Sequence, residues 1–91
     1  MGTYTATVNV TLKDSVLDPQ GKAVLSATSS SGLNSVVDVR VGKTFVIKVD
    51  SASSLEAKNT IEQMCRKLLV NPVIEKYWID EKSIRSEGQS R

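Results

Sequence analysis

Apolar and polar side chains alternate along residues 36–50, and this pattern constrains the fold more than any other feature of the chain. Its apolar members stand at every second position: Val37, Val39, Val41, Phe45, Ile47 and Val49. A period of two is typical of a β-strand with one buried face. The pattern is interrupted only at Gly42-Lys43, where no apolar residue stands.

Two structures could account for this interruption. A hairpin with a two-residue loop would turn the residues after Thr44 to the wrong face, and a three-residue loop prefers glycine where Thr44 stands. We therefore favour one long strand that bends at Gly42 through a β-bulge, and keep the hairpin as the alternative. Because so long a strand would overhang its sheet, we expect a second copy of the chain to cover its free backbone groups.

Further elements are predicted on both sides of this stretch. Residues 3–12 alternate apolar side chains with Thr and Asn, which predicts a first strand with one face on a core. Asp18 before Pro19 is typical of an N-cap and the first helical position, and the Ser-rich residues 28–31 end that helix.

A capping box at Ser53-Ser-Leu-Glu56 predicts the start of a second helix. Its apolar face has the spacing of three and four residues that helices require, and comprises Ala57, Ile61, Met64, Cys65, Leu68 and Leu69. Asn71-Pro72 ends this helix, and residues 73–79 form the last predicted strand.

The element order predicts an α+β fold: a two-layer α/β sandwich of ferredoxin-like β-α-β-α-β plan. Both helices are expected on one face of an antiparallel-containing sheet. We assign residues 1–81 to a single domain and residues 82–91 to a flexible C-terminal tail. The other sheet face combines threonines with Val46, Ile74 and Trp78, a second reason to expect a homo-oligomer, either a dimer or a tetramer.

Several kinds of chemistry are excluded by composition. The chain has no histidine, the commonest general base and metal ligand. Its single cysteine, Cys65, lies on the apolar face of the second predicted helix, so we interpret it as a buried structural thiol. No glycine-rich phosphate loop is present. We therefore predict no catalytic residue and no metal or cofactor bound by this chain.

Charge and hydropathy exclude further classes. Twelve Lys and Arg residues against ten carboxylates leave a net charge of +2, and aromatic residues make up only 4%, so we predict no nucleic-acid partner. No apolar run could span a bilayer and the N-terminus has no signal-peptide pattern, so we predict no membrane partner. One cysteine without a possible partner fits a reducing cytoplasm.

Three stretches carry more polar residues at element junctions than a small sandwich requires. They are Val16-Leu-Asp-Pro-Gln-Gly21, Asp38-Val-Arg-Val-Gly-Lys43 and Leu69-Val-Asn-Pro-Val-Ile-Glu75, with Met64-Cys65 leading into the last. In this order and spacing, over residues 4–80, the chain resembles the PurS family, the small subunit of phosphoribosylformylglycinamidine synthase in purine biosynthesis.

The resemblance implies a non-catalytic subunit that bridges two enzymes. One is a glutaminase, PurQ, which frees ammonia; the other is a synthetase, PurL, which uses ATP and Mg²⁺ to add that ammonia to formylglycinamide ribonucleotide. By resemblance, contacts with partners and within the assembly are expected at residues of the three stretches: Asp18, Pro19, Gln20, Gly21, Asp38, Arg40, Gly42, Lys43, Asn71, Pro72 and Glu75.

Two other functions fit the predicted fold. An acylphosphatase of ferredoxin-like fold would need an arginine in the loop after the first strand, and residues 13–17 contain none. A regulatory module that binds a small ligand such as an amino acid would agree with both the fold and the oligomer. Thermal stabilisation by such a ligand, without any partner protein, would identify it.

Overall fold

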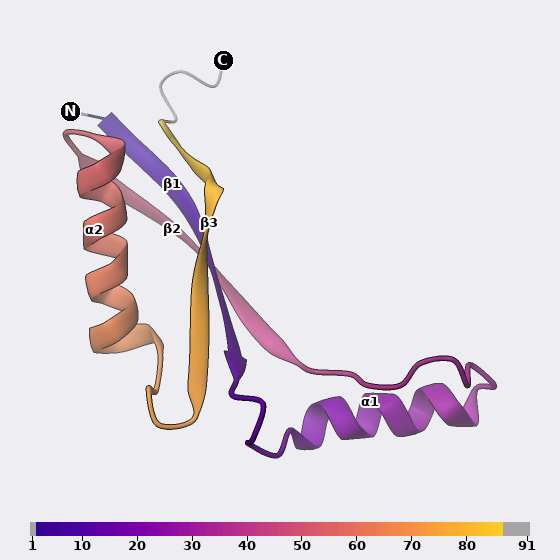
Figure 1. The fold of residues 1–91 in the computed structure, drawn as a ribbon. Helices are drawn as coiled ribbons and strands as arrows, with labels where there is room; N and C mark the ends of the chain where they lie inside the picture. The colour runs from indigo at the N-terminus through magenta and orange to yellow at the C-terminus, as the bar shows by residue number, and fades with distance from the viewer. Residues whose placement is uncertain (1, 87–91) are drawn as a thin grey trace.

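The computed structural model describes residues 2–86, with side chains described for residues 2–80. The elements, in order, are β1 (Gly2–Leu12), α1 (Pro19–Ser30), β2 (Gly42–Ser51), α2 (Ser54–Met64), a π-helical turn (Cys65–Leu69) and β3 (Glu75–Ser86). The strands form one sheet in the order β2-β1-β3, with β1 antiparallel to both neighbours (Figure 1). The predicted α+β class is therefore confirmed.

The central strand β1 supplies the middle of the core, as its alternation predicts. Ala6, Val8 and Val10 are at most 1% exposed. Val8 pairs with Phe45 of β2 on one side and with Ile79 of β3 on the other, so apolar side chains run across the inner face of the sheet. The threonines of β1 point to the opposite face.

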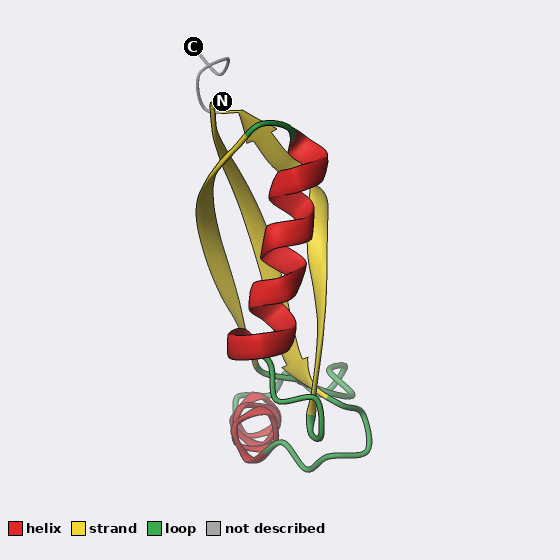
Figure 2. Cartoon of the chain, turned by 90° about the vertical axis from the view of Figure 1, so that its left-hand side faces the viewer, coloured by secondary structure: helices red, strands yellow, loops and turns green. Residues whose placement is uncertain are grey.

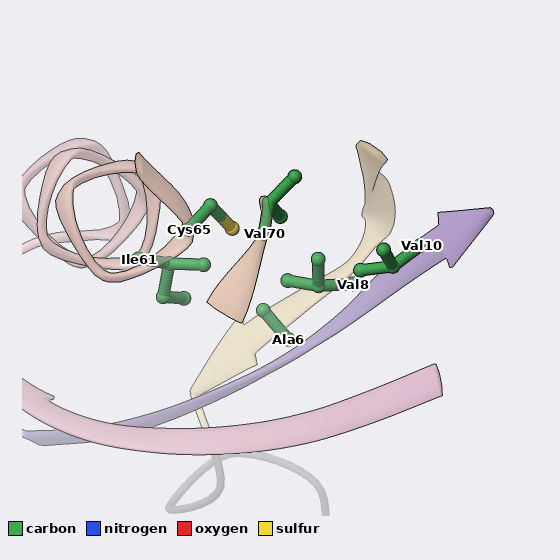
Figure 3. Close-up of a cluster of buried hydrophobic side chains, with 6 residues drawn as sticks. All are labelled: Ala6, Val8, Val10, Ile61, Cys65 and Val70. Carbon is green, nitrogen blue, oxygen red and sulfur yellow. The ribbon is translucent and has the colours of Figure 1, made fainter. Parts of the chain in front are cut away.

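Helix α2 covers this inner face (Figure 2). It begins where the capping box predicts: the Ser53 hydroxyl accepts the Glu56 backbone N–H at 3.2 Å. Ile61 of α2 and Cys65 of the π-helical turn meet the valines of β1, and Val70 completes the cluster (Figure 3).

The C-terminal turn that follows this helix is not the regular α-helix that the sequence predicts. From Cys65 to Leu69 the backbone is π-helical, with the Val70 N–H bonded to the Cys65 carbonyl at 3.1 Å. The wider turn places Leu69, rather than Leu68, below Cys65. Leu69 therefore packs on the core, while Leu68 is 77% exposed and the expectation that it is buried is wrong.

The favoured long strand does not form, and neither does the hairpin. β2 starts at Gly42, which pairs with Thr11 near the end of β1. Residues 36–41 run from beside α1 into β2 (Figure 1) and belong to no strand of the described chain. These residues do alternate apolar and polar side chains. Because β1 ends at Leu12, however, they have no neighbouring strand of the described chain with which to pair.

Helix α1 also departs from the expected position on the sheet. It projects from the end of the sheet, and residues 31–41 run back beside it (Figure 1). Within residues 2–86 it makes no extensive contact with a strand or with α2. The radius of gyration is 16.9 Å, against about 12 Å for a compact chain of this length. No described residue covers its thin apolar stripe fully, since Val24 is 48% exposed.

The last strand is longer than predicted. β3 continues to Ser86, which pairs with Tyr4, after a register shift opposite Thr5 and Thr7. Backbone pairing with β1 does not require apolar side chains, so the polar composition after residue 81 did not end the strand. Residues 82–86 therefore belong to the sheet, and the rest of the predicted tail, residues 87–91, lies outside the described residues.

Candidate partner-binding site

The three polar stretches meet at one end of the sheet. There β1 ends, β2 and β3 begin, and the first turn of α1 approaches (Figure 1). An open hollow of about 310 Å³ lies at this junction, and we call it the junction hollow. Its lining comprises Val10, Thr11, Leu12, Asp18, Pro19, Gln20, Val41, Gly42, Lys43 and Glu75.

Asp18 joins α1 to the segment that leads into β2. One carboxylate oxygen accepts the Gly21 backbone N–H at 2.9 Å, which is the predicted N-cap, and the other accepts the Val41 N–H at 2.7 Å. The hydrogen bonds from Val41 and then Gly21 lower the pKa of this carboxyl below its usual value. Only 4% of Asp18 is exposed, so this residue acts mainly as an internal link between two segments, which we call the Asp18 clamp, and offers little surface to a partner.

Gly21 allows the first turn of α1 to lie close to residues 36–41, which this clamp requires. A Cβ atom at this position would lie 2.2 Å from the Val39 carbonyl oxygen, so the first turn of α1 can approach residues 36–41 only without a side chain here. Gly42 has a similar role at the start of β2, because a Cβ there would lie 2.5 Å from the Val10 carbonyl oxygen. Both predicted glycines therefore shape the junction through their backbones.

Arg40 holds the turn between β1 and α1. Its Nη2 donates to the carbonyl of Lys13 at 2.9 Å and to those of Leu12 and Val16 at 3.4 Å. Asp38 remains exposed, and its carboxylate accepts the N–H of the next residue, Val39, at 2.9 Å.

Glu75 connects the starts of β2 and β3. Its carboxylate lies 3.6 Å from the Lys43 ammonium and accepts the Asn71 backbone N–H at 2.8 Å. The Asn71 side chain in turn accepts the Val73 N–H at 3.0 Å, across the turn that contains Pro72. The Lys43 side chain is 54% exposed, so this pair presents a cation at the rim of the hollow.

The predicted residues thus divide into two groups. Six line the hollow, namely Asp18, Pro19, Gln20, Gly42, Lys43 and Glu75. The other five, Gly21, Asp38, Arg40, Asn71 and Pro72, lie in the segments that shape or flank it. Sequence reasoning did not name the apolar lining residues Val10, Leu12 and Val41 as part of a site, although all three stand at apolar positions of the alternating stretches 3–12 and 36–50. A contact between any of these residues and a partner protein stays a prediction.

The single cysteine does not line the junction hollow. Cys65, the first residue of the π-helical turn, is fully buried, and burial is the main cause that raises the pKa of its thiol. Among the side chains that the structure describes, those of residues 2–80, no three His, Cys, Asp or Glu groups are gathered closely enough to hold a metal ion. No helix in the same range is long and apolar enough to cross a bilayer.

The fold defines a class: a small α+β protein with a three-stranded antiparallel sheet and two helices. Comparison with known proteins agrees with this class. Residues 5–83 match the family PurS, phosphoribosylformylglycinamidine (FGAM) synthase. The chain is 46% identical over 74 residues to the phosphoribosylformylglycinamidine synthase subunit PurS of Bacillus subtilis, covering 81% of this chain and 87% of that relative.

Two solved structures share the fold. Methanocaldococcus jannaschii PurS, one of the subunits of formylglycinamide ribonucleotide amidotransferase in the purine biosynthetic pathway, superposes with a TM-score of 0.78 at 36% identity, covering 91% of this chain and 96% of that one. A chain in the structure of PurLQS from Thermotoga maritima has a TM-score of 0.81 at 26% identity, covering 87% and 96%. The chain belongs to the PurS family of phosphoribosylformylglycinamidine synthase subunits.

Proposed function

We propose that this chain is the non-catalytic subunit that holds the glutaminase PurQ and the synthetase PurL together in FGAM synthase, and that it does so in the cytoplasm. The observation that carries this proposal is the likeness, over 87% of this chain, to one chain of the PurLQS structure from Thermotoga maritima. The site agrees with it, because the junction hollow offers polar groups on a rigid frame and no catalytic group.

The chemistry is assigned to the partners. PurQ releases ammonia from glutamine, and PurL uses ATP with Mg²⁺ to transfer that ammonia to formylglycinamide ribonucleotide. Consistent with this division, the single cysteine is buried, and no group of metal-ligating side chains is found in the described part of the chain. Its task is to dock the two enzymes and support ammonia transfer between them.

The junction hollow is the proposed contact with one of these enzymes. An exposed cation, Lys43, stands beside an apolar floor, and Pro19 and Gln20 at the start of α1 are exposed. A buried apolar centre with a polar rim is the usual anatomy of a protein interface. The chain is proposed to act as a homo-oligomer, because α1 and the Trp78 face of the sheet leave apolar side chains exposed.

Assembly of the three subunits tests this proposal. The host's PurQ and PurL, mixed with ATP and glutamine, should elute together in size-exclusion chromatography only when the chain is added. Lys43→Glu should weaken this co-elution, and more strongly at low salt, because it replaces the rim cation. Lys67→Glu is the matched control, since Lys67 is an exposed lysine of the π-helical turn and does not line the hollow. Co-elution of PurQ and PurL at equal strength without the chain would overturn the bridging role.

A further inference from the structure

Residues 13–41 project from the end of the sheet as an arm that consists of α1 and the two segments connecting it to β1 and β2, and we call it the α1 arm (Figure 1). Figure 2 views α1 end-on, below the sheet and α2. Among the described elements, α1 makes no extensive contact with a strand or with α2. Packing within the described chain therefore does not set the direction of the helix, and the two connecting segments must do so.

Arg40 links these two segments at the base of the arm. It belongs to the returning segment, just before β2 starts at Gly42. Its Nη2 donates to carbonyls of the outgoing segment, to that of Lys13 at 2.9 Å and to those of Leu12 and Val16 at 3.4 Å. A guanidinium is planar and rigid and carries several donors, so it can hold several carbonyl groups in one arrangement. Arg40 therefore spans the gap that opens where the pairing of β1 with β2 ends.

Lys13 carries this link on to the third strand. Its backbone N–H donates to the carbonyl of Ile74 at 2.8 Å, directly before β3. The neighbouring Asp14 carboxylate lies 3.0 Å from the ammonium of Lys76 in β3. The turn that Arg40 holds is thus itself attached to the sheet. Arg40 consequently connects the returning segment of the arm to β3 through the backbone of Lys13.

The Asp18 clamp is a second link across the same gap. Asp18 belongs to the outgoing segment and accepts the N–H of Val41, in the returning segment, at 2.7 Å. Arg40 bonds in the opposite sense, from the returning segment to the outgoing one. A single link would allow rotation about its own axis, whereas two links at different residues oppose both bending and twisting. The base of the arm is therefore held as one rigid connection.

The angle of the arm determines the shape of the junction hollow. Part of the lining belongs to the arm, including Pro19 and Gln20, and part belongs to the sheet, including Lys43 and Glu75. Rotation of the arm at its base would move the first pair relative to the second without a change in either. Arg40 is not among the lining residues, so it acts on the hollow through the position of the arm.

We propose that Arg40, together with the Asp18 clamp, is a positioning residue that fixes the angle between the α1 arm and the sheet. By fixing this angle it sets the shape of the junction hollow, and through the hollow the position of the docked enzyme. The fixed angle concerns the chain alone, whereas its effect on docking rests on the proposed function. Position matters because ammonia must pass between two enzymes, and a misplacement of about 1 Å can cost a reaction about 100-fold.

A distance measurement in the chain alone tests the fixed angle. Spin labels on Ser29→Cys, near the far end of α1, and on Gln63→Cys, exposed on α2, report this angle by double electron–electron resonance. Refolding with an excess of unlabelled chain ensures that only labels within one copy are read. The protein with Arg40 should give a single narrow distance distribution, and Arg40→Ala should lose it. Cys65 stays in place, because it is buried and should take up no label.

Matched variants make this result specific. Arg40→Lys keeps the charge but offers a compact ammonium in place of the planar group, so its distribution should be of intermediate width. Arg66→Ala removes an arginine whose partner, Glu62, lies outside the arm, and should leave the distribution narrow. Labels on Asp50→Cys and Gln63→Cys, both outside the arm, should keep their distance in Arg40→Ala. An unchanged α1 distance in Arg40→Ala would overturn the proposal, since contacts other than these links would then hold the helix.

The ratio of FGAM formed to glutamine hydrolysed tests the effect on docking. It is measured with PurQ, PurL and a saturating amount of the chain, so that weaker binding or lower stability of a variant does not change it. Arg40→Ala should lower this ratio, because ammonia escapes when the two active sites are misplaced, and Arg66→Ala should not. An unchanged ratio in Arg40→Ala, with its narrow distance distribution lost, would overturn the positioning role. If the unmodified chain did not raise glutamine-dependent synthesis at all, the bridging role would be wrong, and the distance measurement would still decide the fixed angle.

Discussion

The Asp18 carboxylate accepts the backbone N–H of Val41 at 2.7 Å, although 23 residues separate them in the chain. The same side chain caps α1 through Gly21. One carboxylate therefore sets both the start of the helix and the path of the segment that enters β2, and the junction hollow depends on this connection.

Substitution of Asp18 should separate its two roles. Asp18→Asn keeps one oxygen for the helix cap but loses the second acceptor, whereas Asp18→Ala loses both. We expect faster amide hydrogen exchange at Val41 in both variants, and at Gly21 mainly in Asp18→Ala. The thermal midpoint should fall further for Ala than for Asn. Unchanged exchange at Val41 in Asp18→Asn would show that the clamp does not hold this segment.

The lowered pKa of Asp18 predicts loss of stability in acid. A group whose pKa is depressed in the folded state contributes stability above its unfolded pKa, about 3.9, and loses it as the pH falls through the lower folded value. Urea midpoints measured from pH 6 down to pH 2 should therefore fall below about pH 4, and less steeply in Asp18→Asn. Asp14 also has a lowered pKa, caused by Lys76, but it is exposed and should contribute little. If the urea midpoint fell equally steeply with pH in the unmodified protein and in Asp18→Asn, Asp18 would not be the source of the acid-dependent loss of stability.

Gly21→Ala should displace the segment that leads into β2. The added Cβ would meet the Val39 carbonyl oxygen, which is backbone and cannot rotate away. We expect a loss of about 1–3 kcal/mol in the free energy of unfolding, as for other overpacked sites. Chemical denaturation measures this loss. Ala23→Gly provides a comparison in the exposed part of α1, where only helix propensity changes, by about 1 kcal/mol. A Gly21→Ala protein of unchanged stability would contradict the close approach.

Cys65 should behave as a core residue and not as a reactive thiol. It is fully buried and its pKa is raised, so thiol reagents should label it slowly in the native protein and quickly in denaturant. Cys65→Ser should cost about 1–3 kcal/mol of stability, because it places a hydroxyl in the apolar cluster. Assembly with partner subunits should persist at temperatures where the variant is folded. Rapid labelling of the native protein would contradict the buried position.

The parts of the fold that sequence predicted are those decided by local chemistry. Alternation placed Val8 and Val10 in the core, and the caps at Asp18 and Ser53 marked the starts of both helices. The position of α1 could not be read in this way, because its thin apolar stripe does not specify which surface covers it. The π-helical turn at Cys65 was missed because a spacing of three and four residues assumes a regular α-helix.

The sequence predicted that the motif residues lie at element ends but not the internal bonds they make, and their contact with a partner stays a prediction. Motif residues at element ends did converge on one hollow, since the C-terminus of β1 and the N-termini of β2 and β3 lie at the same end of the sheet. The internal bonds of Asp18 and Arg40 were not visible in the sequence, because both depend on how residues 36–41 fold back beside α1.

The central claim is that this chain couples glutamine hydrolysis to FGAM synthesis without catalysing either step. Its most direct test is the rate of FGAM formation by PurL and PurQ, with and without the chain, measured with glutamine and with ammonium as the nitrogen source. Omitting the chain should abolish most glutamine-dependent synthesis while PurL keeps activity with ammonium. Glutamine-dependent synthesis at the full rate without the chain would contradict the account.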